Sequence, residues 1–320
     1  MKRLPSVRFG AAGVALAAGL SISLPAGATL RQEAPGRGRS IRCSDTRDAA
    51  RRTSIEVDGE RATGHYALPA GRPRGLVVFA HGYGHSSYSW IEHMKNATRE
   101  HNVIAVAMDY RGLRIQPDSN NDGLPESRGW PVMTGAEDSI AAAQLFQALC
   151  PSIRKTVLLG VSMGGNASGL AVALAKDAKQ RNGGPLWDYW VDVEGVANVI
   201  ETYTGARALA PGNAFAGQAQ QDIEAEMGGT LEESPQAYAE RCVVCRINDI
   251  KESGVKGVVV IHGFDDGLVP YNQAREMGSA LLGAGIPTDM FSVGRKDASD
   301  RDTTVTGAVV GPVDENYNSP

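Results

Sequence analysis

The sequence predicts an α/β fold, with a mostly parallel twisted sheet of about eight strands, helices on both faces and an inserted helical lid. Three observations lead to this prediction. From Gly75 onward, short apolar runs suited to buried strands alternate with helix-prone segments. One run turns through glycines into a helix, and a polar stretch over residues 198–251 interrupts the alternation. With 320 residues, 42% of them hydrophobic, the chain can form one large domain of this class.

The individual elements follow in chain order. Two β-prone runs at 53–57 and 61–68 flank Asp58-Gly59, which is typical of a tight hairpin turn. Further strands are expected at 76–80, 103–108, from Thr156, 190–193, 257–262 and 288–293, and helices at 87–101, 136–149 and 163–180. Because ligands of parallel sheets bind at the carboxyl ends of the strands, a functional site is expected at that edge.

The N-terminal residues have the layout of a secretory signal peptide. A basic start precedes an apolar stretch over residues 9–24 and the small residues 26–28. We expect cleavage after Ala28 and no stable membrane insertion afterwards, because the stretch is short and rich in glycine. The mature protein should be secreted. Residues 29–52, rich in Arg, Gly and Ser, should form a flexible lead-in to the main domain, 53–320.

Charge argues against nucleic acid as a partner. The formal net charge of the chain is −4, and removal of the leader takes away three basic side chains and no acidic one. A mildly acidic protein is a poor partner for phosphate backbones. The sequence leaves the oligomeric state open.

Four cysteines, Cys43, Cys150, Cys242 and Cys245, are present in a chain expected to be secreted. Disulfides are therefore the expected state, and three connectivities are open. The spacing of Cys242 and Cys245 also fits half of a zinc site or a redox pair. A second C-x-x-C and a nearby histidine are missing, so zinc is not favoured.

The segment TVLLGVSMGGNASG, residues 156–169, predicts a buried strand that turns into a helix with a serine on the turn. Gly160, Ser162 and Gly164 form the pattern G-x-S-x-G, in which glycines leave room for a serine on a strained turn. The free N–H groups at the start of the helix can stabilise negative charge beside the Ser162 hydroxyl. Ser162 is thus the candidate nucleophile; the alternative is a glycine-rich connection with an incidental serine.

The strand at 76–80 ends in His81-Gly82-Tyr83-Gly84. Glycines at a strand end allow main-chain N–H groups to point into a site. We expect the N–H groups of Tyr83 and Met163 to be the oxyanion donors, each worth on the order of 10²–10³ in rate. For His81 we expect a structural role that braces the loop.

The strand at 257–262 runs into the segment HGFDDGLVP. A carboxylate at the end of a strand after the nucleophile suits the order serine, acid, histidine. Asp266 is preferred to Asp265, since the turn before Val269-Pro270 should direct it at the site. Its role would be to hold a histidine tautomer and stabilise the imidazolium. The alternative is that both aspartates cap the next helix.

In this order, the segments HGYGH, GVSMGG and HGFDDGLVP resemble those of the α/β-hydrolase family, over residues 76–293. The stretch from Asp249 to residue 291 is similar to the catalytic domain of the prolyl-oligopeptidase-like branch, without the propeller of its peptidases. The resemblance implies an α/β-hydrolase fold and acyl transfer through an acyl-enzyme. It also implies Ser162 as nucleophile, Asp266 as acid, and Tyr83 and Met163 as oxyanion donors. We expect no cofactor and no metal.

The family's histidine should follow the last strand, yet none follows Asp266; the six histidines are His65, His81, His85, His93, His101 and His262. Without a general base the serine hydroxyl is not ionised, and loss of a triad member leaves only ~10³–10⁴-fold catalysis. Three explanations are open. The favoured one places the histidine beyond Pro320, since the tail after Val293 is polar and lacks a closing helix. The others are His85 as the base, and an inactive protein.

The sequence favours a secreted serine hydrolase that acts on a small carboxylic ester, with a lid at 198–251 that shapes the pocket. The first alternative is a peptidase or aminopeptidase acting on short peptides, with Glu194, Glu201 or the pair Glu232-Glu233 holding the substrate's ammonium group. The second is an inactive remnant or a binding domain.

One further motif lies outside these segments. Asp118, Asn120 and Asp122, followed by Gly123, have the spacing of a calcium loop. Gly129 stands where such a loop needs a bidentate glutamate, so we expect a solvated turn.

Overall fold

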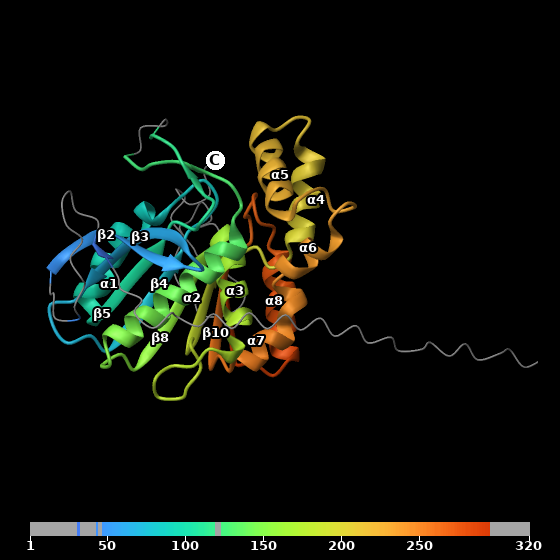
Figure 1. The fold of residues 1–320 in the computed structure, drawn as a ribbon. Coiled ribbons are helices and arrows are strands. Elements are labelled where there is room, and N and C mark those ends of the chain that lie inside the picture. The colour runs from blue at the N-terminus through green and yellow to red at the C-terminus, as the bar shows by residue number, and fades with distance from the viewer. Residues whose placement is uncertain (1–30, 33–42, 44–46, 119–122, 295–320) are drawn as a thin grey trace, which may run out of the picture.

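The computed structural model describes residues 31–32, 43, 47–118 and 123–294 (Figure 1). They form a nine-stranded sheet in the order β1-β2-β3-β5-β4-β8-β9-β10-β11. The strands are β1 (Arg31–Gln32), β2 (Arg47–Val57), β3 (Glu60–Leu68), β4 (Gly75–Ala80), β5 (Val103–Met108), β8 (Lys155–Val161), β9 (Tyr189–Val193), β10 (Gly257–Gly263) and β11 (Thr288–Val293). The pairs from β5–β4 to β10–β11 are parallel, and the three at the N-terminal side are antiparallel. The predicted mostly parallel sheet is confirmed.

Helices cover both faces of the sheet, as predicted. The helices outside the lid are α1 (Ile91–His101), which continues the 3-10 turn η1 (Ser87–Trp90), α2 (Val132–Leu149), α3 (Met163–Leu174) with η2 (Ala175–Asp177), and α8 (Asn272–Gly283). Apolar residues of α1 and η1 pack with Phe79 of β4 in one core cluster. Those of α2, α3 and α8 pack with Val78 in a second, larger cluster. Alternate residues of β4 therefore serve opposite faces.

The start of the domain differs from the expectation. Strand β2 begins at Arg47 and not at residue 53, and β1 pairs with it in antiparallel fashion, so the predicted flexible lead-in over residues 29–52 is in part strand. Pairing of Arg47 with Leu68 of β3 extends the strand to this point, and Arg52 on β2 forms an ion pair with Asp109, with its Nη2 2.6 Å from Asp109 Oδ2. The predicted hairpin turn is confirmed: Asp58 and Gly59 have φ of 52° and 82°, the left-handed pair that a two-residue turn requires.

Two helices have other bounds than expected. Helix α2 begins at Val132, four residues before the expected start at 136, and α3 ends at Leu174, with the 3-10 turn η2 in place of its expected last residues. The main chain of α2 starts directly after Pro131. Most residues of α2 and nearly all of α3 are buried, so tertiary packing sets the ends of both helices more than local propensity does.

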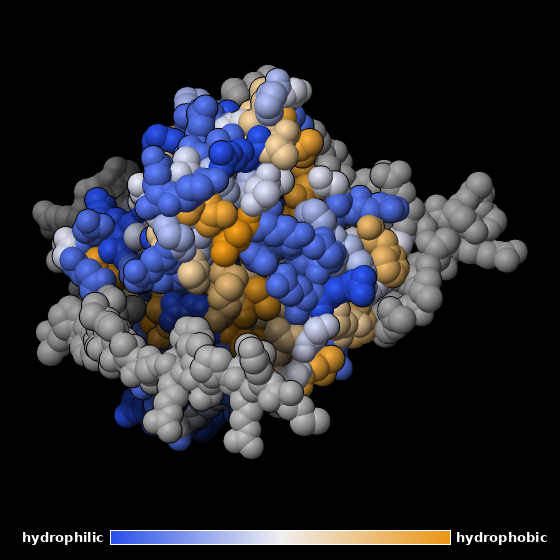
Figure 2. All heavy atoms as spheres, turned by 90° about the vertical axis from the view of Figure 1, so that its right-hand side faces the viewer, coloured by the Kyte–Doolittle hydropathy of each residue, from blue (hydrophilic) through white to orange (hydrophobic). Residues whose placement is uncertain are grey.

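The predicted lid is helical. Between β9 and β10 the chain forms α4 (Val199–Leu209), α5 (Ala214–Met227), α6 (Pro235–Arg241), the 3-10 turn η3 (Val244–Arg246) and α7 (Ile247–Ser253). Asn198 and Asn213 cap α4 and α5 by accepting from main-chain N–H groups three residues on. Figure 1 shows α4, α5 and α6 standing above α8, beyond the carboxyl ends of the strands. On the side shown in Figure 2, apolar surface is interspersed with hydrophilic surface.

The cysteines form two disulfides, Cys43–Cys150 and Cys242–Cys245. The first ties the chain before β2 to the end of α2, across 107 positions of sequence. The second lies at the end of the lid. Among the helices of residues 47–118 and 123–294, none is both long and apolar enough to span a membrane.

Several expectations lie outside the described residues. They are the signal peptide at 1–28, most of the lead-in, the tail at 295–320, and Asn120 and Asp122 of the calcium-like motif. Of that motif, Asp118 Oδ2 accepts a hydrogen bond from Gly123 N at 2.9 Å.

Candidate active site

Ser162 stands on a strained turn between β8 and α3. Its φ of 56° and ψ of −121° are rare for a residue with a side chain and match the nucleophile turn that the G-x-S-x-G pattern predicts. A Cβ on Gly160 would lie 2.6 Å from the carbonyl carbon of Gly164, and one on Gly164 would lie 2.6 Å from that of Ala80. Both flanking positions therefore require glycine.

Main-chain hydrogen bonds fix this turn to the end of β9. Ser162 N donates to Val193 O at 3.0 Å, and Val196 N donates to Ser162 O at 3.1 Å. The Ser162 side chain is half-buried, and its hydroxyl has no hydrogen-bond partner among the described residues. The hydroxyl is thus held at the carboxyl edge of the sheet by its main chain alone.

The loop after β4 runs directly beside the turn. A Cβ on Gly82 would lie 3.4 Å from Ser162 Cβ, which puts the loop in van der Waals range of the serine. In the part of the chain that the structure describes, the main-chain N–H groups of Tyr83 and Met163 have no hydrogen-bond acceptor. Both N–H groups, the predicted oxyanion donors, therefore belong to segments that flank Ser162.

The two histidines of this loop have different surroundings. His81 is buried, its ring stacks on Tyr110 at 4.0 Å between centroids, and its Nδ1 lies 3.0 Å from Gly82 O. Burial lowers the pKa of His81 to about 4, so the ring is neutral at pH 7 and donates to that carbonyl. His81 thus braces the loop, in accord with its predicted role. His85 is exposed and its ring lies next to Gly82: a Cβ built on Gly82 would be 3.8 Å from His85 Cδ2.

Asp266 lies in the loop that follows β10, with a side chain 3% exposed. Its Oδ1 accepts from Leu268 N at 2.8 Å and from Val269 N at 3.0 Å. These N–H groups precede α8, which begins at Asn272, so Asp266 does not cap that helix. Its Oδ2 lies 3.5 Å from Nε2 of His262. That ring donates to Val269 O at 2.7 Å and is buried beneath the loop, which lowers its pKa.

Strand pairing places the turn and the acid loop at the same edge. Val161, the residue before Ser162, pairs with Val193 of β9, and Val193 pairs with Ile261 of β10. Ser162 and Asp266 therefore follow strands that are separated by β9 alone. This is the arrangement that the order serine, acid predicts.

A second carboxyl group, that of Glu194, lies between them. Glu194 directly follows β9 with a φ of 50°, is 4% exposed, and its Oε1 accepts from Gly263 N at 3.3 Å. Burial raises its pKa to about 7, and the negative charge of Asp266 adds to the effect. The sequence suggested Glu194 only as a ligand for an ammonium group. The sequence could have placed Glu194 within the site, because it directly follows a predicted strand of the parallel sheet.

The other carboxylates named for an ammonium group are engaged elsewhere. Glu201 accepts from Asn272 Nδ2 at 2.5 Å. Glu232 pairs with Arg207 at 2.8 Å, and Glu233 accepts from the main-chain N and hydroxyl of Thr230. All three lie on the lid and are held by contacts there or with α8. Of these four glutamates, only Glu194 lies at the end of β9, the strand next to the one that leads to Ser162.

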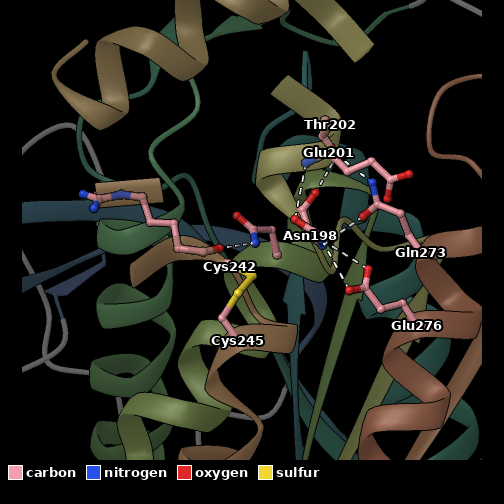
Figure 3. The surroundings of a disulfide bond; sticks show 9 residues. Asn198, Glu201, Thr202, Cys242, Cys245, Gln273 and Glu276 are labelled. Carbon is pink, nitrogen blue, oxygen red and sulfur yellow. Dashed lines mark hydrogen bonds between the residues drawn. A yellow bond between two sulfur atoms is a disulfide. The ribbon is translucent and has the colours of Figure 1, made fainter. Parts of the chain in front are cut away.

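The two ends of the lid are fastened together (Figure 3). Val244 N donates to Ala197 O at 3.1 Å, which joins the chain leaving the lid to the chain leading into it. The Cys242–Cys245 disulfide spans this point. Asn198 N donates to Gln273 Oε1 at 3.0 Å, and Asn198 Nδ2 donates to Glu276, so α8 anchors the same junction. The base of the lid is therefore a connected hydrogen-bonded unit.

Comparison with known proteins adds the following. The sequence model of the protein family described as "Alpha/beta hydrolase family" matches residues 77–299. No curated protein matches. Similar solved structures include an acylaminoacyl peptidase of Pyrococcus horikoshii, with a TM-score of 0.54 and 15% identity over 78% of this chain and 37% of that one. A puromycin-hydrolyzing peptidase of Mycobacterium tuberculosis has a TM-score of 0.54 and 18% identity over 81% and 38%.

An esterase, a mutant form of rPPE, has a TM-score of 0.56 and 16% identity over 79% of this chain and 74% of its own. The chain spans less than half the length of the two peptidases but about three quarters of the esterase. At these identities the likeness concerns the fold alone.

Proposed function

Because the chain belongs to the alpha/beta hydrolase family, we propose that it is a secreted serine hydrolase that cleaves carboxylic esters through an acyl-enzyme on Ser162. The observation that carries this proposal is the strained turn at Ser162. It holds a hydroxyl between two segments whose Tyr83 and Met163 N–H groups have no acceptor among the described residues. The neighbouring strand ends lead to the buried carboxyl groups of Glu194 and Asp266.

In the proposed reaction Ser162 Oγ attacks the ester carbonyl carbon, and the N–H groups of Tyr83 and Met163 stabilise the oxyanion. The tetrahedral species collapses with loss of the alcohol, and water then releases the acid from the acyl-enzyme. The proton of the serine passes to a general base. We propose a histidine oriented by Asp266 for this role, with His85 as the alternative base.

One feature favours esters as substrates. Large apolar side chains stay exposed around the site and suit an apolar acyl or alcohol group; they are Phe264 and Leu268 of the acid loop and Phe215 of α5.

One observation favours an aminopeptidase as the second candidate. Glu194 is a buried carboxyl group near the nucleophile, and an ammonium group would lower its raised pKa and pair with it. Rates on p-nitrophenyl esters and on aminoacyl p-nitroanilides distinguish the two functions. Anilide turnover near ester turnover, lost in Glu194→Gln, would establish the peptidase.

A fluorophosphonate probe tests the proposed nucleophile. The folded chain should be labelled at Ser162 and should hydrolyse p-nitrophenyl butyrate, and Ser162→Ala should lose both properties. A folded wild-type chain that shows neither labelling nor hydrolysis would support the remnant or binding domain instead. Labelling retained in Ser162→Ala would exclude this serine.

A further inference from the structure

Asp222 of α5 connects the lid to the loop that carries a proposed oxyanion donor. Its side chain is 3% exposed and accepts three hydrogen bonds. Oδ2 accepts from the hydroxyl of Tyr83 at 2.6 Å and from Gly129 N at 3.2 Å, and Oδ1 accepts from Arg114 Nη2 at 3.1 Å. All three donors lie outside the lid, and Tyr83 is 139 positions away in sequence.

The side chain of Tyr83 is held by contacts on two sides. Its ring lies 5.7 Å from that of Trp130 and 5.6 Å from that of Phe215, which also belongs to α5. Burial raises the pKa of the Tyr83 hydroxyl above its ordinary value, and the bond to Asp222 adds to this. The phenol therefore stays protonated at working pH and acts as a charge-assisted donor to the carboxylate.

The main chain around Tyr83 needs such an anchor. Gly82 and Gly84 flank it, and Gly84 has a φ of 81°, so the backbone itself offers little resistance to rotation of the Tyr83 peptide. Beyond Gly84 the loop is held by Ser127, whose N donates to Gly84 O at 2.9 Å and whose hydroxyl donates to His85 O at 2.5 Å. The orientation of the Tyr83 N–H thus depends on where its own side chain is fixed.

We propose that Asp222 is a positioning residue, which acts through the Tyr83 hydroxyl to orient the Tyr83 N–H for the oxyanion when the lid is closed. Asp222 also holds Gly129 and Arg114, so a single carboxylate joins the lid, the loop after β4 and the segment around β6 (Arg114–Ile115) and β7 (Ser127–Arg128). The inference rests on the proposed function and adds to it that lid closure completes the oxyanion hole.

A matched tyrosine–carboxylate pair, with its carboxylate on the same helix as Asp222, separates positioning from lid stability. The hydroxyl of Tyr203 on α4 donates to Glu224 Oε1 at 2.8 Å, two positions along α5 from Asp222. This is also a bond between a tyrosine and a carboxylate of α5, but both partners belong to the lid. Loss of the Tyr203–Glu224 bond weakens the lid without direct effect on the loop after β4.

The experiment compares D222N, Y83F, the double variant and E224Q in the full chain, with kcat and KM for a p-nitrophenyl ester and the rate of fluorophosphonate labelling. D222N and Y83F should each lower kcat and the labelling rate by about 10- to 100-fold, because small misplacement of a catalytic group has such effects. KM should stay within about twofold, and the double variant should be no worse than the single ones. E224Q should keep kcat within about twofold.

Unchanged kcat in D222N, equal losses in D222N and E224Q, or additive losses in the double variant would each overturn the proposal. If the wild-type chain neither reacts with the probe nor turns over ester, the proposed function fails, and hydrogen exchange decides the inference separately. In that case D222N, but not E224Q, should speed exchange of the amides at 82–85. Equal exchange in wild type and D222N would refute the role of Asp222.

Discussion

Asp192, on a strand that is paired on both sides, should make the protein less stable as the pH rises. It lies on β9, is 3% exposed, and its Oδ1 has no hydrogen-bond partner in the described part of the chain. A Cβ on Gly195 would lie 2.6 Å from its carboxyl carbon, so the main chain closes over the group just behind the nucleophile turn. Burial alone raises the pKa of Asp192 from 3.8 to about 7.

The direction of the effect follows from proton binding. Below about pH 4 the carboxyl group is protonated in both the folded and the unfolded chain. Between pH 4 and 7 the unfolded chain loses the proton and the folded one keeps it, so the free energy of unfolding falls as the pH rises. Above pH 7 both states are ionised and the loss is complete. The difference between 3.8 and about 7 corresponds to about 4 kcal/mol.

Asp192→Asn removes this titration. The wild type should lose about 4 kcal/mol of unfolding free energy through this group between pH 4 and pH 8. The variant should not show this loss, because asparagine stays neutral throughout. Urea titrations followed by tryptophan fluorescence at both pH values measure the difference. Asp289→Asn, at an exposed position on β11, controls for the loss of a charge. Parallel pH profiles of wild type and Asp192→Asn would show that the carboxyl group is not held neutral by burial.

Three further predictions concern the nucleophile turn, Glu194 and the N-terminus. Gly164→Ala should destabilise the protein by about 3 kcal/mol, because its Cβ would lie 2.6 Å from the carbonyl carbon of Ala80. Thermal unfolding measures the effect, and an unchanged midpoint would contradict the tight turn. Glu194→Gln should reduce the loss of stability as the pH rises from about 4.5 to 7, because the raised pKa of Glu194, like that of Asp192, lowers the free energy of unfolding over this range. Urea titrations over this range test it. An unaltered dependence of the unfolding free energy on pH would count against a buried neutral Glu194. Expression in a secreting host should yield a chain whose first residue is Thr29, by N-terminal sequencing; retention of the leader would argue against a signal peptide.

Much of the fold was predictable because its determinants are local in sequence. The strands that end at Ala80, Met108 and Val161 are continuous apolar runs, as expected for strands buried on both faces, and the run ahead of Ser162 is followed by glycines that a main-chain turn demands. The hairpin at Asp58-Gly59 depends on two left-handed residues that the dipeptide supplies. In each case the physical requirement falls within about ten positions.

The remaining features depend on contacts between distant segments. The sequence around Arg47 is rich in arginine and resembles a flexible segment, yet it continues a strand because a partner, β3, lies beside it. The pKa values of Asp192 and Glu194 are set by burial, and alternation within a strand of five residues does not reveal which acidic residues the sheet encloses. The bond between Tyr83 and Asp222 leaves no sequence pattern at all.

These differences divide the site into two parts with different origins. Main-chain geometry at the carboxyl edge fixes the position of Ser162, the proposed nucleophile, and brings Asp266 to the same side, and the glycine pattern reflects this geometry. The side-chain contact from the lid to Tyr83 is the one that, in our proposal, orients an oxyanion donor. Because Asp222 is the buried carboxylate through which the lid holds the Tyr83 hydroxyl, we expect substitution at Asp222 to slow the reaction of every ester substrate alike, whereas substitutions elsewhere in the lid should leave the turn at Ser162 undisturbed.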